Sequence, residues 1–319
     1  MIARDWGSIE AAVLAPLYAG ERRRWLQTLQ WDSAPSWQEV EHARVAWGLP
    51  GFVAMDVAGV PRGVAFYLQE AERIDIGGLT ADCIDATDCL LDALVAAAAE
   101  ARATTVRILA LDAAVALASG LRIRGFDVEP HFYLSRPLTA AAVRPHPRPA
   151  PAPSSGSGDL DAWRAGDEDA VAALLSRAYD RESAVLFAPH HEAGEWQRYV
   201  RNLVSHVGCG TFNATQSALL REGDALRGVA LITDIGPRTA HLVQLAVDPC
   251  RRGRRTGVHL LEHVSGSLRA AGYSALTLMV AQRNRPARSL YDRAGFRHDA
   301  TFLGGTLRLQ GHQRLRPAI

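Results

Sequence analysis

Apolar residues recur in two distinct patterns along the second half of the chain. A spacing of three and four residues predicts helices, whereas short apolar runs bounded by turn residues predict strands. The predicted helices cover residues 168–179, 258–271 and about 287–294. The predicted strands form a hairpin across 217–235 that turns at 222–224, continue at 240–247 and 275–280, and close with a hairpin around 302–309. This order of elements predicts a mixed sheet of the α/β class.

The first half of the chain repeats this order of elements. Its predicted elements are a hairpin over 52–68, a strand over 73–79, an Ala-rich helix over 88–101, a strand over 105–111 and an apolar run over 116–126. Two short matches accompany the repeat: Arg62-Gly63-Val64-Ala65 with Arg227-Gly228-Val229-Ala230, and Gly125-Phe126 with Gly295-Phe296. Self-similarity of this kind predicts an internal duplication of one α/β unit.

Between the halves lies a stretch rich in Pro and then in Ser and Gly, TAAAVRPHPRPAPAPSSGSG, over residues 139–158. Such a composition cannot bury a core, and it favours an extended Pro-rich part and a flexible Ser/Gly part. We therefore predict two domains, 1–138 and 159–319, joined by this linker. A length of 319 residues agrees with two domains.

Composition narrows the class of partner. The net charge is +1, which argues against a nucleic-acid or anionic-membrane surface and favours small-molecule partners. All 35 basic residues are arginine. The cysteines show no spacing typical of a metal site or a disulfide framework. Because the chain has neither a signal-peptide pattern nor an apolar run of about 18 residues, we expect a cytoplasmic protein, a monomer or homodimer.

The segment VDPCRRGRRTGVHLLEHV is the most specific in the chain. A strand ends at Val247, Pro249 imposes a turn, and a Gly-bearing loop leads into a helix. The first N–H groups of a helix lack internal partners and favour an anion, and Arg252 and Arg254 add positive charge beside them. This arrangement predicts a diphosphate site, although an Arg-rich solvated turn would have a similar sequence.

This loop resembles the Arg/Gln-x-x-Gly-x-Gly/Ala loop of the GNAT acetyltransferase superfamily. Arg255 stands where that family usually has its first glycine. If the position needs a positive φ, arginine there costs on the order of 1 kcal/mol; if it does not, the guanidinium can add a phosphate contact. The resemblance implies a tandem pair of GNAT folds, acetyl-CoA as co-substrate, and these binding residues: Leu245, Ala246, Val247, Arg252, Gly253, Arg254, Arg255, Thr256, Gly257, Val258, Asn284, Ala287 and Ser289.

A second segment, QRNRPARSLYDRAGF, resembles the family pattern Asn-x-x-Ala-x-x-Leu-Tyr-x-x-x-Gly-Phe. The matching residues are Asn284, Ala287, Leu290, Tyr291, Gly295 and Phe296. In the family, the Asn contacts the pantetheine arm and the Tyr hydroxyl lies near the thioester sulfur. The resemblance therefore implies that Tyr291 is the general acid that protonates the departing thiolate. The alternative is a tyrosine that only packs in the core beside Phe296.

Transfer to an amine also requires a base, because an ammonium has no free lone pair. His241, at the start of the strand before the loop, is one candidate, since its ordinary pKa near 6.5 suits the role. Asp234 on the preceding strand competes with it, and a chain of waters could replace both. The family places its oxyanion donor on a backbone N–H beside a β-bulge in this strand, which implies Leu245 and Val247.

The first half should not bind coenzyme A in this way. Aligned over the helix leucines, its loop sets Asp82, Asp85 and Asp88 at or beside the places of Arg252, Arg255 and Gly257. Three carboxylates would repel a diphosphate. Aligned over the Gly-Phe pairs, Leu121 stands in the place of Tyr291. We therefore predict a degenerate, non-catalytic N-terminal copy.

The acceptor is expected between residues 180–199 and 301–309. Asp180, Glu182, Glu192 and Glu195 could attract an amine, and Trp196 and Phe187 could form a wall, although a solvated loop explains the carboxylates equally well. Adjacent His190 and His191 rarely hold one metal ion, so no metal is expected. The expected function is N-acetyl transfer to a primary amine of a small molecule or peptide. The alternative is a non-catalytic acyl-CoA-binding or regulatory protein.

Overall fold

A computed structural model describes residues 1–112, 116–138, 159–184 and 187–309, so the predicted linker at 139–158 lies outside the described residues. The chain divides into two compact units. Unit 1 comprises Met1–Tyr133, Val280–Arg285 and the described residues from His298 on; unit 2 comprises Leu134–Met279 and Pro286–Arg297. The described residues from His298 on thus group with unit 1, and the domain bounds 1–138 and 159–319 stay a prediction.

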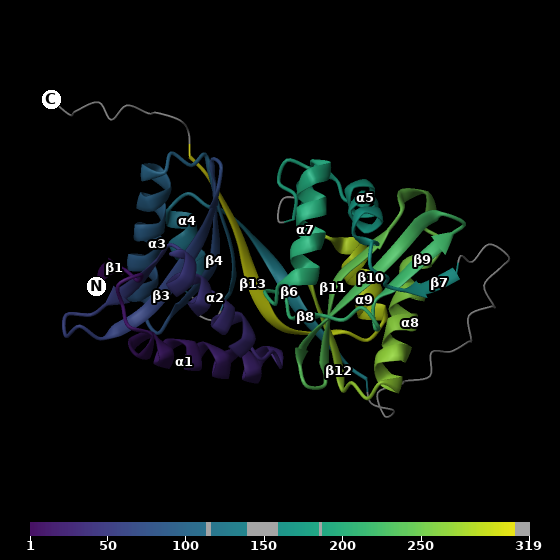
Figure 1. The fold of residues 1–319 in the computed structure, drawn as a ribbon, viewed down its shortest axis with the longest axis horizontal. Helices are drawn as coiled ribbons and strands as arrows, with labels where there is room; N and C mark the ends of the chain where they lie inside the picture. The colour runs from purple at the N-terminus through teal and green to yellow at the C-terminus, as the bar shows by residue number, and fades with distance from the viewer. Residues whose placement is uncertain (113–115, 139–158, 185–186, 310–319) are drawn as a thin grey trace. The chain divides into compact units, whose positions relative to one another are not determined.

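Unit 1 is a sheet with helices on both faces (Figure 1). Its strands, in spatial order, are β1 (Ile2–Asp5), β2 (Gly51–Met55), β3 (Pro61–Glu70), β4 (Arg73–Ala81), β5 (Thr105–Leu111) and β13 (Arg297–Arg308). Its helices are α1 (Ala11–Leu29), α2 (Ala34–Trp47), α3 (Ile84–Glu100) and α4 (Ala116–Ile123). Neighbouring strands are antiparallel except β4 and β5, which are parallel.

The closing segment of the chain corrects one prediction. We expected a hairpin around 302–309, but β13 is a single strand that pairs with β5, from Phe302 opposite Leu111 to Arg308 opposite Thr105. Its two glycines serve packing rather than a turn. A Cβ on Gly305 would lie 2.8 Å from the Ile108 side chain.

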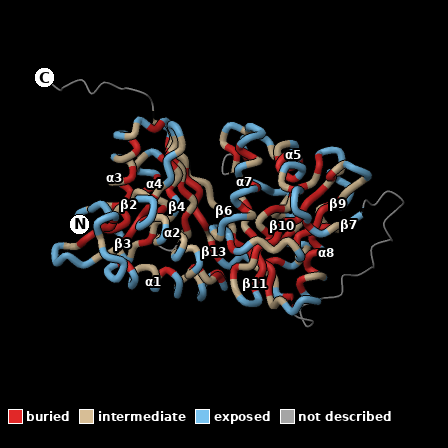
Figure 2. Tube along the Cα trace, viewed as in Figure 1, coloured by how far each residue is buried: buried red, intermediate tan, exposed pale blue. Residues whose placement is uncertain are grey.

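Two apolar clusters cover the two faces of this sheet. Leu90, Leu91 and Leu94 of α3 are buried with Ile74, Val106 and Ile108 on one face. Trp6, Leu14 and Phe66 belong to a separate cluster that the partly buried Trp37 of α2 joins. In Figure 2 buried residues recur along β2, β3, β4, β5 and β13 of this unit, whereas α1 and α2 are mostly half-buried or exposed.

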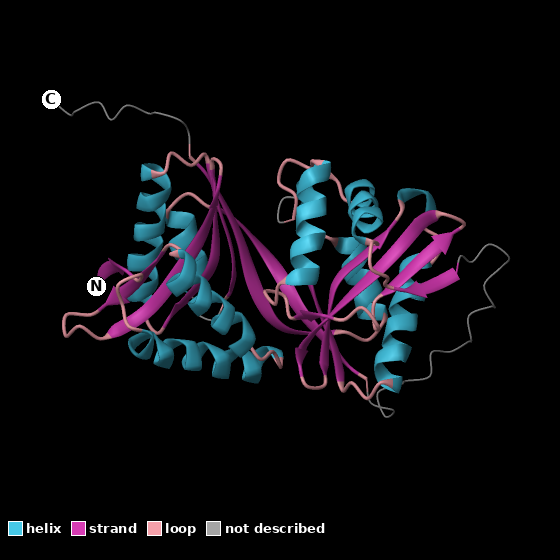
Figure 3. Ribbon diagram, viewed as in Figure 1, coloured by secondary structure: helices cyan, strands magenta, loops and turns pink. Residues whose placement is uncertain are grey.

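The strands of unit 2 also pair in a mixed arrangement (Figure 3). Its strands, in spatial order, are β6 (Asp127–Pro137, from Leu134 on), β12 (Ala275–Ala281), β11 (Thr239–Val247), β10 (Ala225–Gly236), β9 (Ala218–Glu222) and β7 (Asp159–Ala162), with β8 (Thr211–Phe212) also paired to β10. Its helices are α5 (Glu168–Ala178), α6 (Arg181–Ala184), α7 (Ala193–Ser205), α8 (Thr256–Ala270) and α9 (Arg285–Arg293).

Helices cover both faces of this sheet as well. Residues of α5 and α7 share a core with Leu219, Val229, Leu231 and Ala246. Adjacent strand residues point to opposite faces, and at Gly228, next to Val229, a Cβ would lie 2.8 Å from Leu260 of α8. Therefore α8 packs on the face opposite α5 and α7. No helix among the residues that the structure describes is long and apolar enough to cross a membrane.

Identical backbone contacts in the two units confirm the duplication. Asp82 donates its N–H to the Arg62 carbonyl, and Asp248 donates to Arg227, each over 2.9 Å. In the same way Phe126 bonds to Leu121 (3.1 Å), and Phe296 bonds to Tyr291 (3.0 Å). The prediction that Leu121 in unit 1 is equivalent to Tyr291 in unit 2 is therefore confirmed.

The same comparison corrects the predicted alignment of the loops. Asp82 takes the place of Asp248 rather than that of Arg252, and α3 begins at Ile84, directly after Asp82 and Cys83. In unit 2 the corresponding loop runs from Asp248 to Arg255. The alignment failed because it allowed no gap. Unit 1 does not carry an acidic version of the loop; it lacks most of the loop.

Candidate active site

The centre of unit 2 is an opening between β11 and β12. These parallel strands pair only from Thr239–Leu242 with Ala275–Leu278. On its other side, β11 pairs with β10, and the register shifts between Leu231 (opposite Gln244) and Ile232 (opposite Leu242), which leaves Val243 as the extra residue of a β-bulge. Among the described residues, no strand pairs with the β12-facing edge of β11 beyond Leu242. Its backbone groups are therefore available to a ligand.

The predicted oxyanion residues lie just beyond this bulge. Leu245 stands opposite Ala230 and Val247 opposite Gly228 on β10. Between them, Ala246 is buried among the side chains that α5 and α7 cover. The bulge is on the strand where the family resemblance placed it, two residues before Leu245.

A short 3-10 turn, Pro249–Arg251, starts the loop that comes after β11. The Asp248 side chain accepts the Cys250 N–H over 3.1 Å and lies 3.4 Å from Arg177 and 3.5 Å from Arg227. Its hydrogen bond with the Cys250 side chain is the main reason that the pKa of Asp248 is lowered. The nearby arginines balance the carboxylate, so it does not oppose an anion at the loop.

Arg255 has a left-handed backbone, with φ 62° and ψ 10°, immediately before α8. Gly253 also has a positive φ, of 75°. Of the two alternatives for Arg255, the first is therefore correct: the position does require a positive φ, and arginine is strained there by roughly 1 kcal/mol. The side chains of Arg254 and Arg255 are exposed and make no ion pair or hydrogen bond with a described residue.

The start of α8 presents backbone donors beside these guanidinium groups. The first hydrogen bond of the helix runs from the His259 N–H to the Arg255 carbonyl over 3.0 Å. The N–H groups of Thr256, Gly257 and Val258 therefore precede the hydrogen-bond ladder of the helix. Together with the helix dipole and two unpaired arginines, they fit a diphosphate.

Packing brings this helix start to β11 and α9. A Cβ on Gly257 would be in ordinary contact with Leu290, at 3.5 Å, and with Val247, at 3.7 Å. Arg252 donates through Nη2 to the Ala178 carbonyl at the end of α5. Arg252 thus ties the loop to α5, while Arg254 and Arg255 are left for a ligand.

The ring of Tyr291 on α9 packs in the core, while its hydroxyl is available to a ligand. Its ring is 7% exposed and meets Phe296 edge to face, with centroids 5.6 Å apart. The hydroxyl makes no hydrogen bond to a described residue. Burial, and then the neighbouring Tyr179, raise the pKa of Tyr291 above its ordinary value. The phenol is therefore protonated at neutral pH, as a general acid must be.

The remaining residues of the second motif occupy different environments. Ala287 is half-buried on α9, and Ser289 is exposed and accepts a hydrogen bond from Arg293 over 2.5 Å. Asn284 precedes α9 in the part of the chain that belongs to unit 1, and its N–H donates to the Ala281 carbonyl over 3.0 Å.

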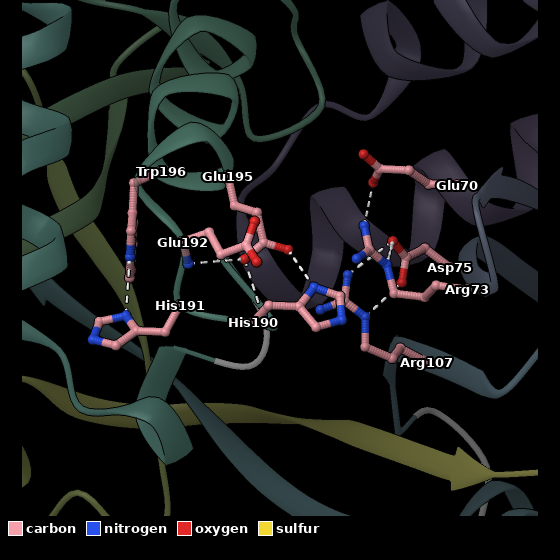
Figure 4. A network of polar contacts seen from close by, with 9 residues as sticks. All are labelled: Glu70, Arg73, Asp75, Arg107, His190, His191, Glu192, Glu195 and Trp196. Atoms are coloured by element: carbon pink, nitrogen blue, oxygen red, sulfur yellow. Dashed lines mark hydrogen bonds and ion pairs between the residues drawn. The ribbon is translucent and has the colours of Figure 1, made fainter.

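His241 lies in the middle of the paired part of β11 and β12. It is 3% exposed, and its Nδ1 is 2.8 Å from the Thr277 hydroxyl of the opposite residue. Burial lowers the pKa of His241 to about 3. At the equivalent place in unit 1, Asp75 stands opposite Arg107 and forms an ion pair with it (Figure 4). Both pairs join two strands, and a buried imidazole of such low pKa is a poor general base.

Asp234, the competing base, is held by neighbouring side chains. The Asn213 amide donates to its two oxygens over 3.2 and 3.0 Å, and the Tyr273 hydroxyl donates over 2.8 Å. This contact contributes, after burial, to raising the pKa of Tyr273 to about 12. Asp234 thus links β10 to the segments before β9 and after α8.

The residue that the sequence analysis missed is Gln244. It is 2% exposed, comes directly after the bulge of β11, and is held at both ends: its Oε1 accepts from the Tyr179 hydroxyl (2.6 Å) and its Nε2 donates to the Tyr199 oxygen (2.7 Å). A lone amide inside the apolar strand HLVQLAV was the available signal, because a buried polar group requires partners.

The segment before α7 is stabilised from within. His190 Nδ1 lies 2.8 Å from Glu195, whose other oxygen accepts the N–H groups of His190 and Glu192 (Figure 4). Trp196 donates its indole N–H to His191 over 3.1 Å. Glu192 and Glu195 form a capping box at the start of α7. No group of three metal-ligating side chains exists among the described residues.

Comparison with known proteins shows which family this chain is similar to. Residues 175–296 match the model of the acetyltransferase (GNAT) family. The fold is similar to a GCN5-related N-acetyltransferase from Sphaerobacter thermophilus, with a TM-score of 0.64 and 17% identity over 96% of this chain and 95% of that one. A tandem GNAT protein from the clavulanic acid biosynthesis pathway gives a TM-score of 0.53 and 16% identity over 83% and 84% of the two chains. No curated protein matches the sequence.

Proposed function

Residues 175–296 are a domain of the GNAT acetyltransferase family, and from this premise we propose that the chain transfers an acetyl group from acetyl-CoA to a primary amine of a small molecule or peptide. The observation that carries the proposal is the start of α8. Free N–H groups and two unpaired arginines meet there, next to the open edge of β11 and the Tyr291 helix.

Binding of acetyl-CoA is assigned to this chain's backbone and arginines. The N–H groups of Thr256, Gly257 and Val258 hold the diphosphate, with Arg254 and Arg255 beside them. Backbone groups on the open edge of β11, from Val243 to Val247, hold the pantetheine arm. Acetyl-CoA supplies the activated thioester.

The chemistry depends on the groups that surround the end of that arm. A backbone N–H at Leu245 or Val247 stabilises the negative charge that develops on the carbonyl oxygen. Tyr291, buried and protonated, gives its proton to the departing sulfur. Neither His241 nor Asp234 suits the role of base, because one is buried with a low pKa and the other is bound by Asn213 and Tyr273.

The second candidate function is a non-catalytic acyl-CoA-binding protein. It would need the same anion site but not a tyrosine hydroxyl free of protein partners. The Tyr291 hydroxyl has no hydrogen-bond partner among the described residues, and this favours the enzyme. The strain at Arg255 does not separate the two functions, because both need the same anion site.

A thiol-release assay with acetyl-CoA and a panel of primary amines tests the proposal. Tyr291→Phe is expected to lower kcat by roughly 10²–10⁴-fold, with little change in the KM for acetyl-CoA, because a general acid acts in the transition state. Tyr67→Phe, in unit 1, is the matched control and should leave kcat unchanged. Binding of acetyl-CoA without turnover of any amine would support the binding protein instead.

A further inference from the structure

Gln244 fixes the direction of two tyrosine hydroxyls. The Tyr179 hydroxyl donates its hydrogen bond to Gln244 Oε1, so its oxygen can still accept another. The Tyr199 oxygen accepts a hydrogen bond from Gln244 Nε2, so its own O–H can still donate one. A glutamate in this place would accept from both hydroxyls. The amide therefore leaves Tyr179 as an acceptor and Tyr199 as a donor next to the bulge of β11.

The aromatic side chains around these hydroxyls are neutral. Burial raises the pKa of Tyr179, Tyr199 and Tyr291, and the ionisable groups that add to these shifts are Tyr179 and Cys209. The rings of Phe187 and Trp196 surround the tyrosines, with centroids 5.1–6.2 Å apart. All of these side chains are uncharged at neutral pH.

Several charged groups on the elements around this site already have partners, and Arg252 donates to the Ala178 carbonyl next to Tyr179. On α7, Glu195 binds His190 and two backbone N–H groups. On α5, Arg177 lies 3.4 Å from Asp248. On β10, Asp234 is bound by Asn213 and Tyr273, and His241 of β11 is neutral above pH of about 3.

We propose that the enzyme takes its acceptor as the uncharged amine, and that Gln244 is the positioning residue that orients it. This inference rests on the proposed function. The Tyr179 oxygen accepts one amine N–H, which turns the nitrogen lone pair toward the thioester carbonyl. The acceptor class is then a weakly basic primary amine with an apolar or aromatic body, because these uncharged side chains do not stabilise a cation.

The protons balance without a base in the protein other than Tyr291 itself. An ammonium first releases its proton to bulk water. The nitrogen lone pair of the free amine forms the C–N bond, the C–S bond breaks, and the sulfur leaves with that electron pair. The sulfur takes the proton of Tyr291, and the proton that the new amide nitrogen loses restores Tyr291. No oxidant or further reactant is involved.

The pH dependence of kcat/KM distinguishes a free-amine enzyme from one with its own base. The probes are the best amine of the panel and an analogue with fluorine beside the amino group, which has a similar shape and a lower conjugate-acid pKa. We expect kcat/KM to rise about tenfold per pH unit and to level off at the pKa of each amine. The same inflection for both amines would assign the titration to the protein and overturn the proposal.

Variants at Gln244 test its role. Gln244→Glu adds a carboxylate between the two tyrosines, so the pH profile of kcat/KM should gain an inflection shared by both amines. The exposed Gln69→Glu is the matched control and should not change that profile.

Gln244→Leu should lower kcat more than tenfold, while the inflection of the pH profile still follows the pKa of the amine. Tyr199→Phe, which retains the aromatic ring in the core and removes only the hydroxyl, should also lower kcat. If Gln244→Leu and Tyr199→Phe both retain full kcat, Gln244 has no positioning role. Failure of every amine would instead remove the proposed function.

Discussion

Asp82 and Asp248 hold equivalent positions in the two units, since each donates its N–H over 2.9 Å to an arginine carbonyl on the neighbouring strand. Each also lies near the guanidinium of that arginine, Asp82 at 3.1 Å from Arg62 and Asp248 at 3.5 Å from Arg227. The two units differ in the chain that comes directly after this aspartate. After Asp82 the chain enters α3 almost at once, whereas after Asp248 it forms the loop that ends at Arg255.

This difference predicts one acetyl-CoA per chain. Titration calorimetry with the full chain should give a stoichiometry of one, because unit 1 lacks the loop that presents N–H groups and arginines to a diphosphate. Tyr291→Phe should leave that stoichiometry unchanged. A second site that persists when Arg254 and Arg255 are both changed to Ala would place binding in unit 1.

Local pattern was enough to predict the elements that form the anion site. A strand, a turn at Pro249, a Gly-bearing loop and an amphipathic helix succeed one another in sequence, and the structure has all of them. The equivalence of Leu121 with Tyr291 could also be predicted, because the Gly-Phe pair after each of them fixes the backbone contact.

Contacts between distant segments could not be predicted. Periodicity describes the alternation of β13 but not its pairing with β5, which lies far away in the sequence. In the same way, the strand around Gln244 shows that its amide needs partners but not that these are Tyr179 and Tyr199. The burial that makes His241 a poor base also depends on packing rather than on its neighbours in sequence.

Arg254→Ala should raise the KM for acetyl-CoA about tenfold and leave kcat unchanged. The side chain has no partner among the described residues, so its loss removes a phosphate contact in ground and transition states alike. Arg4→Ala, at an exposed position of β1, is the matched control. Steady-state kinetics measure both effects, and an unchanged KM in Arg254→Ala would contradict our placement of the phosphates.

The buried His241 predicts a loss of stability in mild acid. Its pKa is about 3 in the fold and 6.5 in the unfolded chain, so the unfolded state gains the proton first. Its contribution is fully present above pH 6.5 and is lost as the pH falls toward 3. Urea unfolding should show the free energy of the wild type falling below pH 6.5 by up to about 1.4 kcal/mol per pH unit more steeply than that of His241→Gln.

The control for this measurement is His206→Gln, at an exposed position after α7, which should keep the wild-type steepness. Equal steepness in the wild type and His241→Gln would show that His241 takes up its proton over the same pH range in the fold as in the unfolded chain. In that case it would again be a candidate for the base.

Arg255→Gly should separate stability from binding. Glycine relieves the left-handed backbone at φ 62°, so the free energy of unfolding should rise by about 1 kcal/mol. The same change removes a guanidinium that has no partner among the described residues, so the KM for acetyl-CoA should rise about fivefold. Arg102→Gly, at φ 55° in unit 1, should gain similar stability with no change in KM. An unchanged or lower KM in Arg255→Gly would mean that the strained backbone alone, and not the side chain, shapes the anion site.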